Sequence, residues 1–310
     1  MALRERAAAS PGSTHPVAAE FGIVAVMLTG LFVLQRTVAE VMAVLLAPPP
    51  AGDGILVSGL LRGLLLVSSV VVFGYVYVSA RGIAVRRSVP TRSDLPTVAF
   101  AAAVPLGLAG VTKLAGSLTG VPYNGLVMAS YAADASPLPI ALVAAVGILT
   151  SVPILVVVSQ MLLQGSFERV MATDEAIVAT TVVASVVFTS STGSVTAIPE
   201  PERVVVIGCF ALLGALAVYG TDRFAGRDRR RFLAFVPLAA FSLLAVLSAI
   251  AAIGSITEGL YAIAHLATFG VAAYAYDRTD SPIAPAIAYV SLLVANVAIV
   301  YLLEAGMRSW

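Results

Sequence analysis

The sequence predicts an all-α membrane protein, a polytopic bundle of about nine transmembrane helices. Charged residues make up 11% of the 310 residues, against roughly 25% in soluble globular proteins. Hydrophobic residues make up 59%, and the mean hydropathy is +0.98. Because so few charges cannot cover a water-exposed surface, we expect the lipid bilayer to cover most of the chain. The apolar runs are too long for barrel strands, and helices satisfy their own backbone groups in lipid.

Nine apolar segments are each close to the roughly 20 residues that a helix needs to cross a bilayer. The first segment carries Arg36 and Glu40, which are four residues apart and are expected to pair on one helix face. A break is expected at 254–259, and the Gly- and Pro-containing stretch 116–138 is predicted to be an external loop. The nine segments lie near residues 20–45, 55–79, 95–115, 139–163, 174–193, 203–220, 232–253, 257–276 and 282–303.

The placement of arginines predicts the orientation, because cytoplasmic loops collect positive charge. Arginines gather in the amino tail, after the second segment and after the sixth, whereas residues 194–202 contain acids and no base. Nine spans then put the amino terminus in the cytoplasm and the carboxyl terminus outside the cell membrane. We expect 1–16 to be a disordered cytoplasmic tail, 17–138 a group of amino-terminal membrane helices, and 139–310 a membrane core.

Composition also excludes several kinds of function. The net charge of +1 and the lack of a basic tract with interleaved aromatics argue against nucleic-acid binding. Cys209 is the only cysteine, which excludes an intramolecular disulfide and a Cys-rich metal site. The only histidines are His15 and His265, which excludes the zinc-protease helix that carries two histidines four residues apart.

Polar residues within apolar segments are candidates for function, because they are costly in lipid. Gln160 and Gln164 are four residues apart, and their amides are expected to face the protein interior. Glu258 and His265 share a helix face but are about 10 Å apart, too far to hold one ion together. We expect His265 to bond a neighbouring helix and not to bind a metal.

The joint between the last two segments has a distinctive residue order, from Tyr276 to Pro282. Asp280 or Ser281 is expected to cap the final helix, and Pro282 suits its first turn. The order resembles the carboxyl-terminal signature of the CPBP family of intramembrane proteases (CAAX proteases and bacteriocin-processing enzymes, also called Abi), which reads Tyr-x-Arg-Thr-Gly-Ser. The matching residues are Tyr276, Arg278, Thr279 and Ser281, with Asp280 in place of the glycine.

For the other motifs of the family, the spacing of the positions matches, but the residues that define each motif are replaced. Ser159 and Gln160 stand where the family has two glutamates, and Gln164 stands where it has arginine, before a matching glycine. Thr192 takes the position of the histidine in Phe-x-x-x-His. Tyr289 takes that of the next histidine, and the asparagine after it falls on Leu293. The resemblance covers about 150–303, and it implies a cavity lined by Gln160, Gln164, Phe188, Thr192, Tyr289 and, one turn further on, Asn296.

These replacements remove the family's acid–base groups. Amides and hydroxyls cannot act as general bases unaided near neutral pH, and a zinc site needs about three His, Cys or carboxylate ligands. The resemblance therefore implies an inactive relative without a cofactor, a pseudoprotease that binds membrane or membrane-proximal proteins. The nearby carboxylates of Glu168, Asp174 and Glu175 are expected to solvate a cytoplasmic loop, with Asp174 suited to cap a helix.

Two alternatives remain open. The chain is an active intramembrane endopeptidase if displaced acids or His265 do the chemistry, with zinc as a possible cofactor. It is a carrier or channel for a small solute if His265, Glu258 and the Arg36–Glu40 pair form a polar path.

Overall fold

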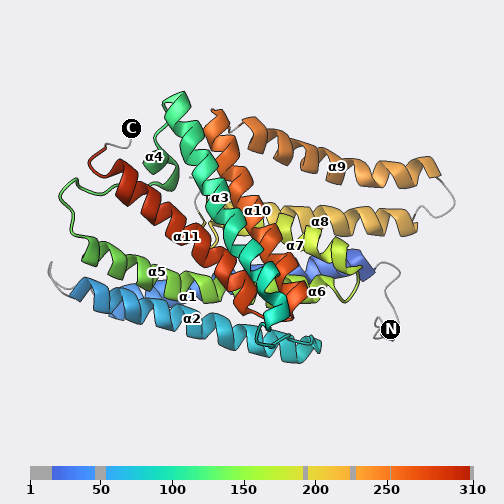
Figure 1. Cartoon of the computed structure of the whole chain (residues 1–310). Coiled ribbons are helices and arrows are strands. Elements are labelled where there is room, and N and C mark those ends of the chain that lie inside the picture. Colours follow the sequence, from blue (N-terminus) through green and yellow to red (C-terminus); the bar gives the residue numbers. More distant parts are fainter. Residues whose placement is uncertain (1–15, 46–53, 191–194, 224–227, 252, 308–310) are drawn as a thin grey trace.

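The computed structural model describes residues 16–45, 54–190, 195–223, 228–251 and 253–307, which are mainly helical (Figure 1). Within these ranges the only β-type contact is an isolated bridge between Thr189 and Val195. The predicted tail 1–16 lies outside them except for its last residue. The elements are α1 (Pro16–Leu45), α2 (Gly54–Arg81), η1 (Arg92–Asp94), α3 (Leu95–Thr119), α4 (Tyr123–Val127), α5 (Pro137–Val156), η2 (Val157–Gln164), α6 (Gly165–Phe167), α7 (Thr173–Phe188), α8 (Pro201–Arg223), α9 (Asp228–Ala251), α10 (Ile256–Thr279) and α11 (Ile283–Glu304).

Six described segments are long and apolar enough to cross a membrane, which supports a multi-pass membrane protein. The shorter α7 has only 16 residues, and the described apolar part of α9 is limited to Val236–Ala251. Each of the nine predicted segments nevertheless corresponds to a helix. The six segments are Pro16–Val44, Val57–Arg81, Arg92–Thr119, Pro137–Phe167, Ile256–Thr279 and Ile283–Glu304.

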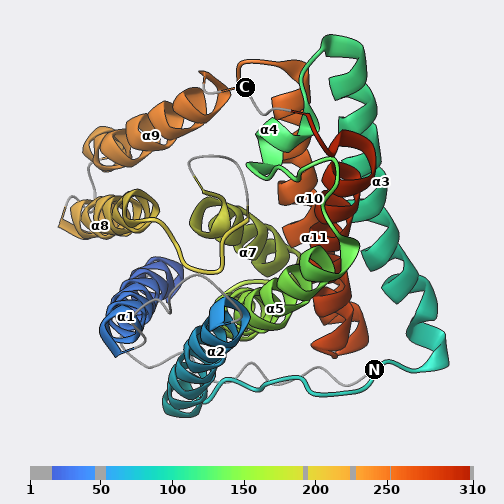
Figure 2. The same cartoon turned by 90° about the vertical axis from the view of Figure 1, so that its left-hand side faces the viewer.

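The helices form two flanks with α5 and α7 between them. Figure 2 shows α1, α8 and α9 stacked on one flank, and α3, α10 and α11 together on the other. The helix α1 packs mainly against α2 and α8, whereas α10 packs mainly against α3, α7 and α11. The largest core cluster fills the space between the flanks, with Leu31, Leu155, Phe188, Phe269 and Tyr289 among its members.

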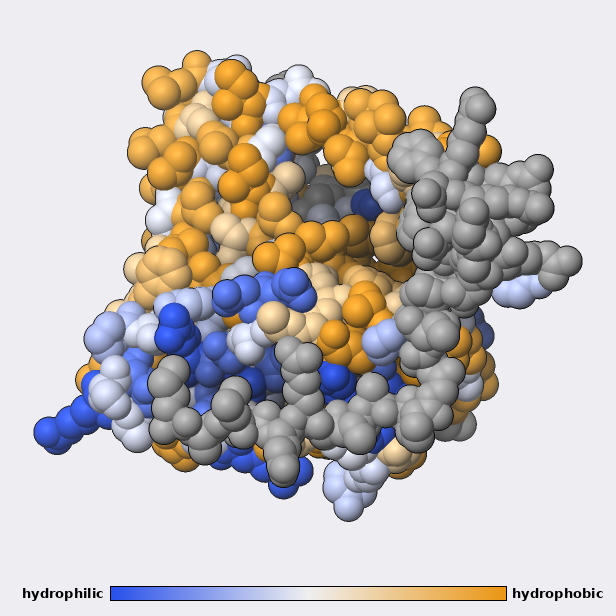
Figure 3. Space-filling model, turned by 90° about the vertical axis from the view of Figure 1, so that its right-hand side faces the viewer, coloured by the Kyte–Doolittle hydropathy of each residue, from blue (hydrophilic) through white to orange (hydrophobic). Residues whose placement is uncertain are grey.

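The outer surface is largely apolar, as a lipid-facing surface must be. Figure 3 shows hydrophobic residues over most of one face and hydrophilic residues gathered along its lower edge. We call this edge the arginine end, because it contains the loop 82–91 that comes after α2. The opposite end of the bundle, where α3 and α11 finish, is called the glutamate end, after Glu304.

Local signals explain where several helices stop. Gly120 ends α3 at φ 76°, and Asp280 ends α10 at φ 50°, both in the left-handed region that favours glycine. At the start of α11 the N-cap is Pro282, and not Asp280 or Ser281 as predicted, but the Oγ of Ser281 accepts a hydrogen bond from the Ile283 N–H at 3.2 Å. A break separates α9 from α10, but it is shorter than the predicted 254–259, because α10 already begins at Ile256.

Two predictions about loops and pairs have mixed outcomes. The stretch 116–138 is not wholly a loop, because α3 continues to Thr119 and α4 forms within it. The predicted Arg36–Glu40 pair is confirmed, with Nε and Oε1 2.8 Å apart on the exposed side of α1.

Candidate functional site

The fourth apolar segment changes its winding where the motif residues lie. Pro153 lies inside α5, and the chain continues as the π-helix η2 from Val157 to Gln164. Proline removes a backbone donor and disturbs the α-helical ladder, and π-helical turns occur often at functional sites. Gln160 and Gln164 have no exposed surface, so the prediction that they face the interior is confirmed.

Gln160 is hydrogen bonded to Tyr289, which joins the first and last motif positions across the bundle. The Gln160 Nε2 donates to the Tyr289 hydroxyl at 3.0 Å, and the hydroxyl lies 3.4 Å from Gln160 Oε1. Both side chains are buried. The two residues therefore form hydrogen bonds with each other in a buried contact, and the cavity expected around them stays a prediction.

Aromatic rings connect the middle motif to the same place. The Phe188 ring stacks on Phe269, with centroids 6.3 Å apart, and Phe269 meets Tyr289 edge to face at 5.6 Å. Phe188, Phe269 and Tyr289 are all buried. Gln160 is thus linked through Tyr289 and Phe269 to Phe188, so that η2, α11, α10 and α7 each contribute one side chain. We call Gln160, Phe188, Phe269 and Tyr289 the motif cluster.

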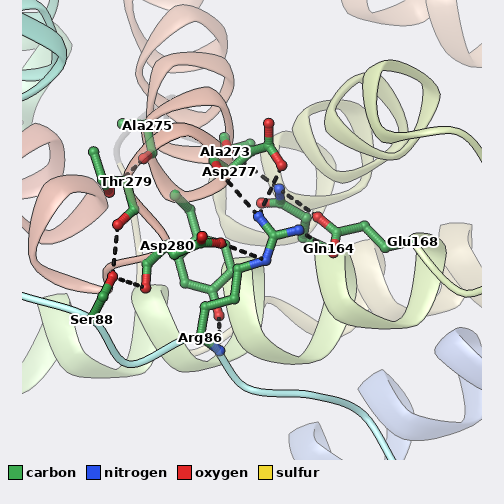
Figure 4. Close-up of polar contacts among 10 residues, drawn as sticks. Arg86, Ser88, Gln164, Glu168, Ala273, Ala275, Asp277, Thr279 and Asp280 are labelled. Atoms are coloured by element: carbon green, nitrogen blue, oxygen red, sulfur yellow. Dashed lines mark hydrogen bonds and ion pairs between the residues drawn. The ribbon is translucent and has the colours of Figure 1, made fainter. Parts of the chain in front are cut away.

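One helical turn along η2, a second polar group forms around Arg86, from the loop after α2 (Figure 4). Its Nη1 lies 2.8 Å from Asp277 Oδ1, its Nη2 2.9 Å from Glu168 Oε2, and its Nε 3.2 Å from Asp280 Oδ1. Gln164 Nε2 donates to Glu168 Oε1 at 3.1 Å and to the Ala273 carbonyl at 3.3 Å. Arg86, Gln164, Glu168, Asp277 and Asp280 are the Arg86 cluster.

The charges in the Arg86 cluster are unequally balanced. Burial lowers the pKa of the Arg86 guanidinium, but the bond to Asp277 and the charges of Glu168, Asp277 and Asp280 raise it above its ordinary value. Burial raises the pKa of the Glu168 carboxyl, and Arg86 and Gln164 only partly oppose this. Three carboxylates therefore favour the charged form of Arg86. The single Arg86 cation does not fully offset the cost of burying the charged form of Glu168.

The joint between α10 and α11 is held by the same loop. The Ser88 Oγ donates to the carbonyls of Thr279 and Asp280, each at 2.7 Å. Asp280 has a left-handed φ of 50°, a conformation that glycine adopts without strain. Aspartate is tolerated at such positions, and here its carboxylate reaches Arg86.

Other predicted site residues lie apart from the motif cluster. Asn296 Oδ1 accepts from the Tyr123 hydroxyl at 2.7 Å, nearer the glutamate end. Glu258 is at the start of α10, where its Oε2 accepts from the Gly254 N–H at 2.7 Å. Ser159, in contrast, is buried in η2 directly before Gln160, and its hydroxyl lies close enough to that of Tyr289 to interact with it. The predicted position of Thr192 lies outside the described residues.

Three predictions about these groups are wrong. His265 does not bond a neighbouring helix: its Nδ1 lies 2.8 Å from the Tyr261 carbonyl of α10 itself. Glu168 does not solvate a loop, because it is mostly buried against Arg86. Asp174 does not cap α7, since the cap is Ala172 and Asp174 lies in the first turn.

The sequence alone did not indicate the polar group at the glutamate end. The Glu304 carboxylate is fully buried and pairs with the Lys113 ammonium. It also accepts from the backbone N–H groups of Tyr123 at 2.9 Å and Asn124 at 2.6 Å. A carboxylate at the edge of an apolar segment resembles an ordinary helix end, and the one signal was that Lys113 is the only lysine.

Hydrogen bonds and ion pairs hold the Arg86 cluster and the Glu304–Lys113 pair together. Among the described residues, no three His, Cys, Asp or Glu side chains are grouped so that they could hold a metal ion. Comparison with known proteins gave no match to any family model, curated protein or solved structure.

Proposed function

We propose that this chain is a degenerate relative of the CPBP intramembrane proteases, a non-hydrolytic protein of the cell membrane that binds a membrane or membrane-proximal protein. The observation that carries this proposal is the buried hydrogen bond between Gln160 and Tyr289. This bond joins η2 and α11, and the residues that it links were matched to two separate motifs of the family. Phe188 approaches the same point through Phe269, as the third motif would require.

The loss of hydrolysis follows from the side chains that meet there. Neither an amide nor an un-ionised phenol accepts a proton readily near neutral pH, and neither is a usual zinc ligand. Losing one acid–base group typically costs about 10²–10⁴ in rate. With all of the family's groups replaced, we expect no turnover.

The proposed topology has nine spans and a cytoplasmic amino terminus. The Arg86 and Glu20–Arg81 contacts lie at one end of the bundle, and the Lys113–Glu304 contact lies at the other. The positive-inside rule then assigns the arginine end to the cytoplasm.

The alternatives have less support. Glu168 is held by Arg86, and Asp174 and Glu175 are exposed at the start of α7, away from the motif cluster. For a solute path, Arg36 and Glu40 pair on the exposed side of α1, and α1 packs against α2 and α8 while His265 lies on α10.

A cleavage assay tests the inactive assignment. The purified chain is placed in liposomes with a tethered transmembrane reporter, beside the Glu175→Gln and His265→Ala variants. We expect no cleavage above that of protein-free liposomes from any of them. Cleavage by the wild type that either variant abolishes would establish the active endopeptidase instead. Solute flux in the same liposomes would favour the transporter.

Partner binding is tested through the motif cluster itself. Proteins cross-linked to the chain in its native membrane are compared between wild type, Gln160→Leu/Tyr289→Phe, and the exposed control Arg36→Ala/Glu40→Ala. We expect the motif variant to lose specific partners that the control keeps. Equal partner sets in all three would show that the motif cluster does not support binding.

A further inference from the structure

The signature arginine of the α10–α11 joint, Arg278, points away from the buried clusters. It is exposed, and its guanidinium carbon lies 5.3 Å from the centroid of the Tyr274 ring, one turn earlier on α10. A guanidinium over an aromatic face is attracted to the ring and held in place by it. The cation is therefore positioned at the surface and is not paired with an acid among the described residues.

Two exposed aromatic side chains continue this surface toward the middle of the bundle. Tyr274 of α10 and Phe100 of α3 meet edge to face, with centroids 6.3 Å apart. They keep 38% and 48% of their surface exposed. Exposed aromatic rings at the end of a transmembrane helix are typical of the membrane–water boundary.

The neighbouring helix supplies apolar surface beside the arginine. The helices α3 and α10 run antiparallel, since Thr119 contacts Thr257 at one end and Phe100 contacts Tyr274 toward the other. The start of α3 therefore lies beside the turn that carries Arg278. Leu95, at this start, is 59% exposed.

The carboxylates near Arg278 are occupied by other groups. Asp277 and Asp280 are bonded to Arg86 (Figure 4). Asp94 accepts from the backbone N–H and the hydroxyl of Thr91, each at 2.7 Å. Arg278 is thus an exposed cation at this edge of the α3–α10 surface, where η1 also carries the exposed Arg92.

We propose that Arg278, Tyr274 and Phe100 form a binding site for one phospholipid molecule, with the lipid phosphate on Arg278 and an acyl chain along the two rings. Charge complementarity identifies the headgroup, since guanidinium groups bind phosphate through strong charge-assisted hydrogen bonds. The exposed surface of Tyr274, Phe100 and Leu95 is apolar enough to bind the acyl chain of the lipid. This site is separate from the motif cluster, so it stands or falls independently of the proposed function.

Native mass spectrometry of the whole chain, released from detergent micelles, tests the site. Phosphatidylglycerol is titrated against diacylglycerol with the same acyl chains, which lacks the phosphate. We expect the wild type to retain phosphatidylglycerol and not diacylglycerol. We expect Arg278→Gln to weaken phosphatidylglycerol binding about tenfold, as for the loss of one charged hydrogen bond.

The control is Arg87→Gln, which removes another exposed arginine of the same end, and should bind as the wild type does. Tyr274→Leu should also weaken binding, which provides a second variant if Arg278→Gln does not fold. Equal affinity of the wild type and Arg278→Gln, equal retention of diacylglycerol, or an equal loss in Arg87→Gln would each overturn the proposal.

Discussion

The two ends of the bundle hold their helices with opposite arrangements of charge. At the arginine end, one guanidinium serves three carboxylates, and the paired side chains keep between 18% and 66% of their surface exposed. At the glutamate end, one carboxylate with no exposed surface receives an ammonium and two backbone N–H groups. The Arg86 cluster thus has more carboxylates than cations, whereas Glu304 is one carboxylate that receives several donors.

This difference shows that burial, more than the number of contacts, decides what each group contributes. Removing one partner of a buried pair leaves an uncompensated charge, whereas exposed pairs are screened by water and contribute little. We therefore expect the Glu304 group at the glutamate end to be more sensitive to substitution than the Arg86 cluster at the arginine end. Substitutions at four residues test this contrast, and their expected effects decrease from Glu304 to Arg36.

The largest effect is expected for Glu304→Ala. The Lys113 ammonium loses its buried partner, and two N–H groups at the start of α4 lose their acceptor. We expect the free energy of unfolding to fall by about 3–5 kcal/mol, measured by denaturant unfolding in detergent. The double variant Lys113→Met/Glu304→Met should lose less than Glu304→Ala, because it leaves no unpaired charge. A larger loss in the double variant would contradict this account.

Arg86→Ala should have a smaller effect, about 1–3 kcal/mol, because water reaches the carboxylates that it leaves. Arg86→Lys should restore little, since Arg86 uses Nε, Nη1 and Nη2 for three different acids. The same unfolding measurement applies. If Arg86→Ala proved as destabilising as Glu304→Ala, the contrast between the two ends would not hold.

Acidity should affect the arginine end through Glu168. Its pKa is raised above the ordinary 4.5, so the folded chain binds more protons there than the unfolded chain. The contribution of this group to stability is greatest below pH 4.5 and falls as the pH rises through the raised pKa. We expect Glu168→Gln to reduce this fall, seen as thermal midpoints at a series of pH values. If the wild type instead became more stable relative to Glu168→Gln as the pH rises, the pKa of Glu168 would be lowered by folding, and the prediction would be wrong.

The smallest effect is expected for Arg36→Ala. The Arg36 and Glu40 side chains are 64% and 65% exposed, and such helical pairs contribute about 0.3–0.5 kcal/mol. The midpoint of unfolding should change little, which makes this variant the baseline for the other three. A loss above about 1 kcal/mol would indicate that α1 is held through this face.

Much of the fold could be predicted because lipid imposes a simple rule on composition and length. Each predicted apolar segment corresponds to a helix, and the ends at Gly120 and Ser281 carry recognisable signals. The π-helical winding of η2 could not be predicted, because nothing in the residue types from Val157 to Gln164 distinguishes a π-helix from an α-helix. The register of a helix depends on what its side chains contact across the bundle.

The candidate site was only partly predictable for a related reason. Gln160 and Gln164 were identified because an amide in lipid needs a partner, but the partners themselves come from α10 and α11. In the sequence, Arg86 is one of several arginines in the same loop, and Glu304 lies just after the last predicted segment, so neither residue stands out. What distinguishes these two residues is burial against acids and donors more than 80 residues away in sequence.

The π-helical winding of η2 makes this segment sensitive to its residue count. A π-helix accommodates more residues in each turn than an α-helix does, so deleting one residue between Val157 and Ser159 would favour regular α-helical winding in this stretch. Such a deletion would change the position of Gln160 or Gln164 relative to the Tyr289 hydroxyl and the Ala273 carbonyl, to which they now donate. The length of this stretch, and not only its residue types, therefore determines which side chains reach α10 and α11.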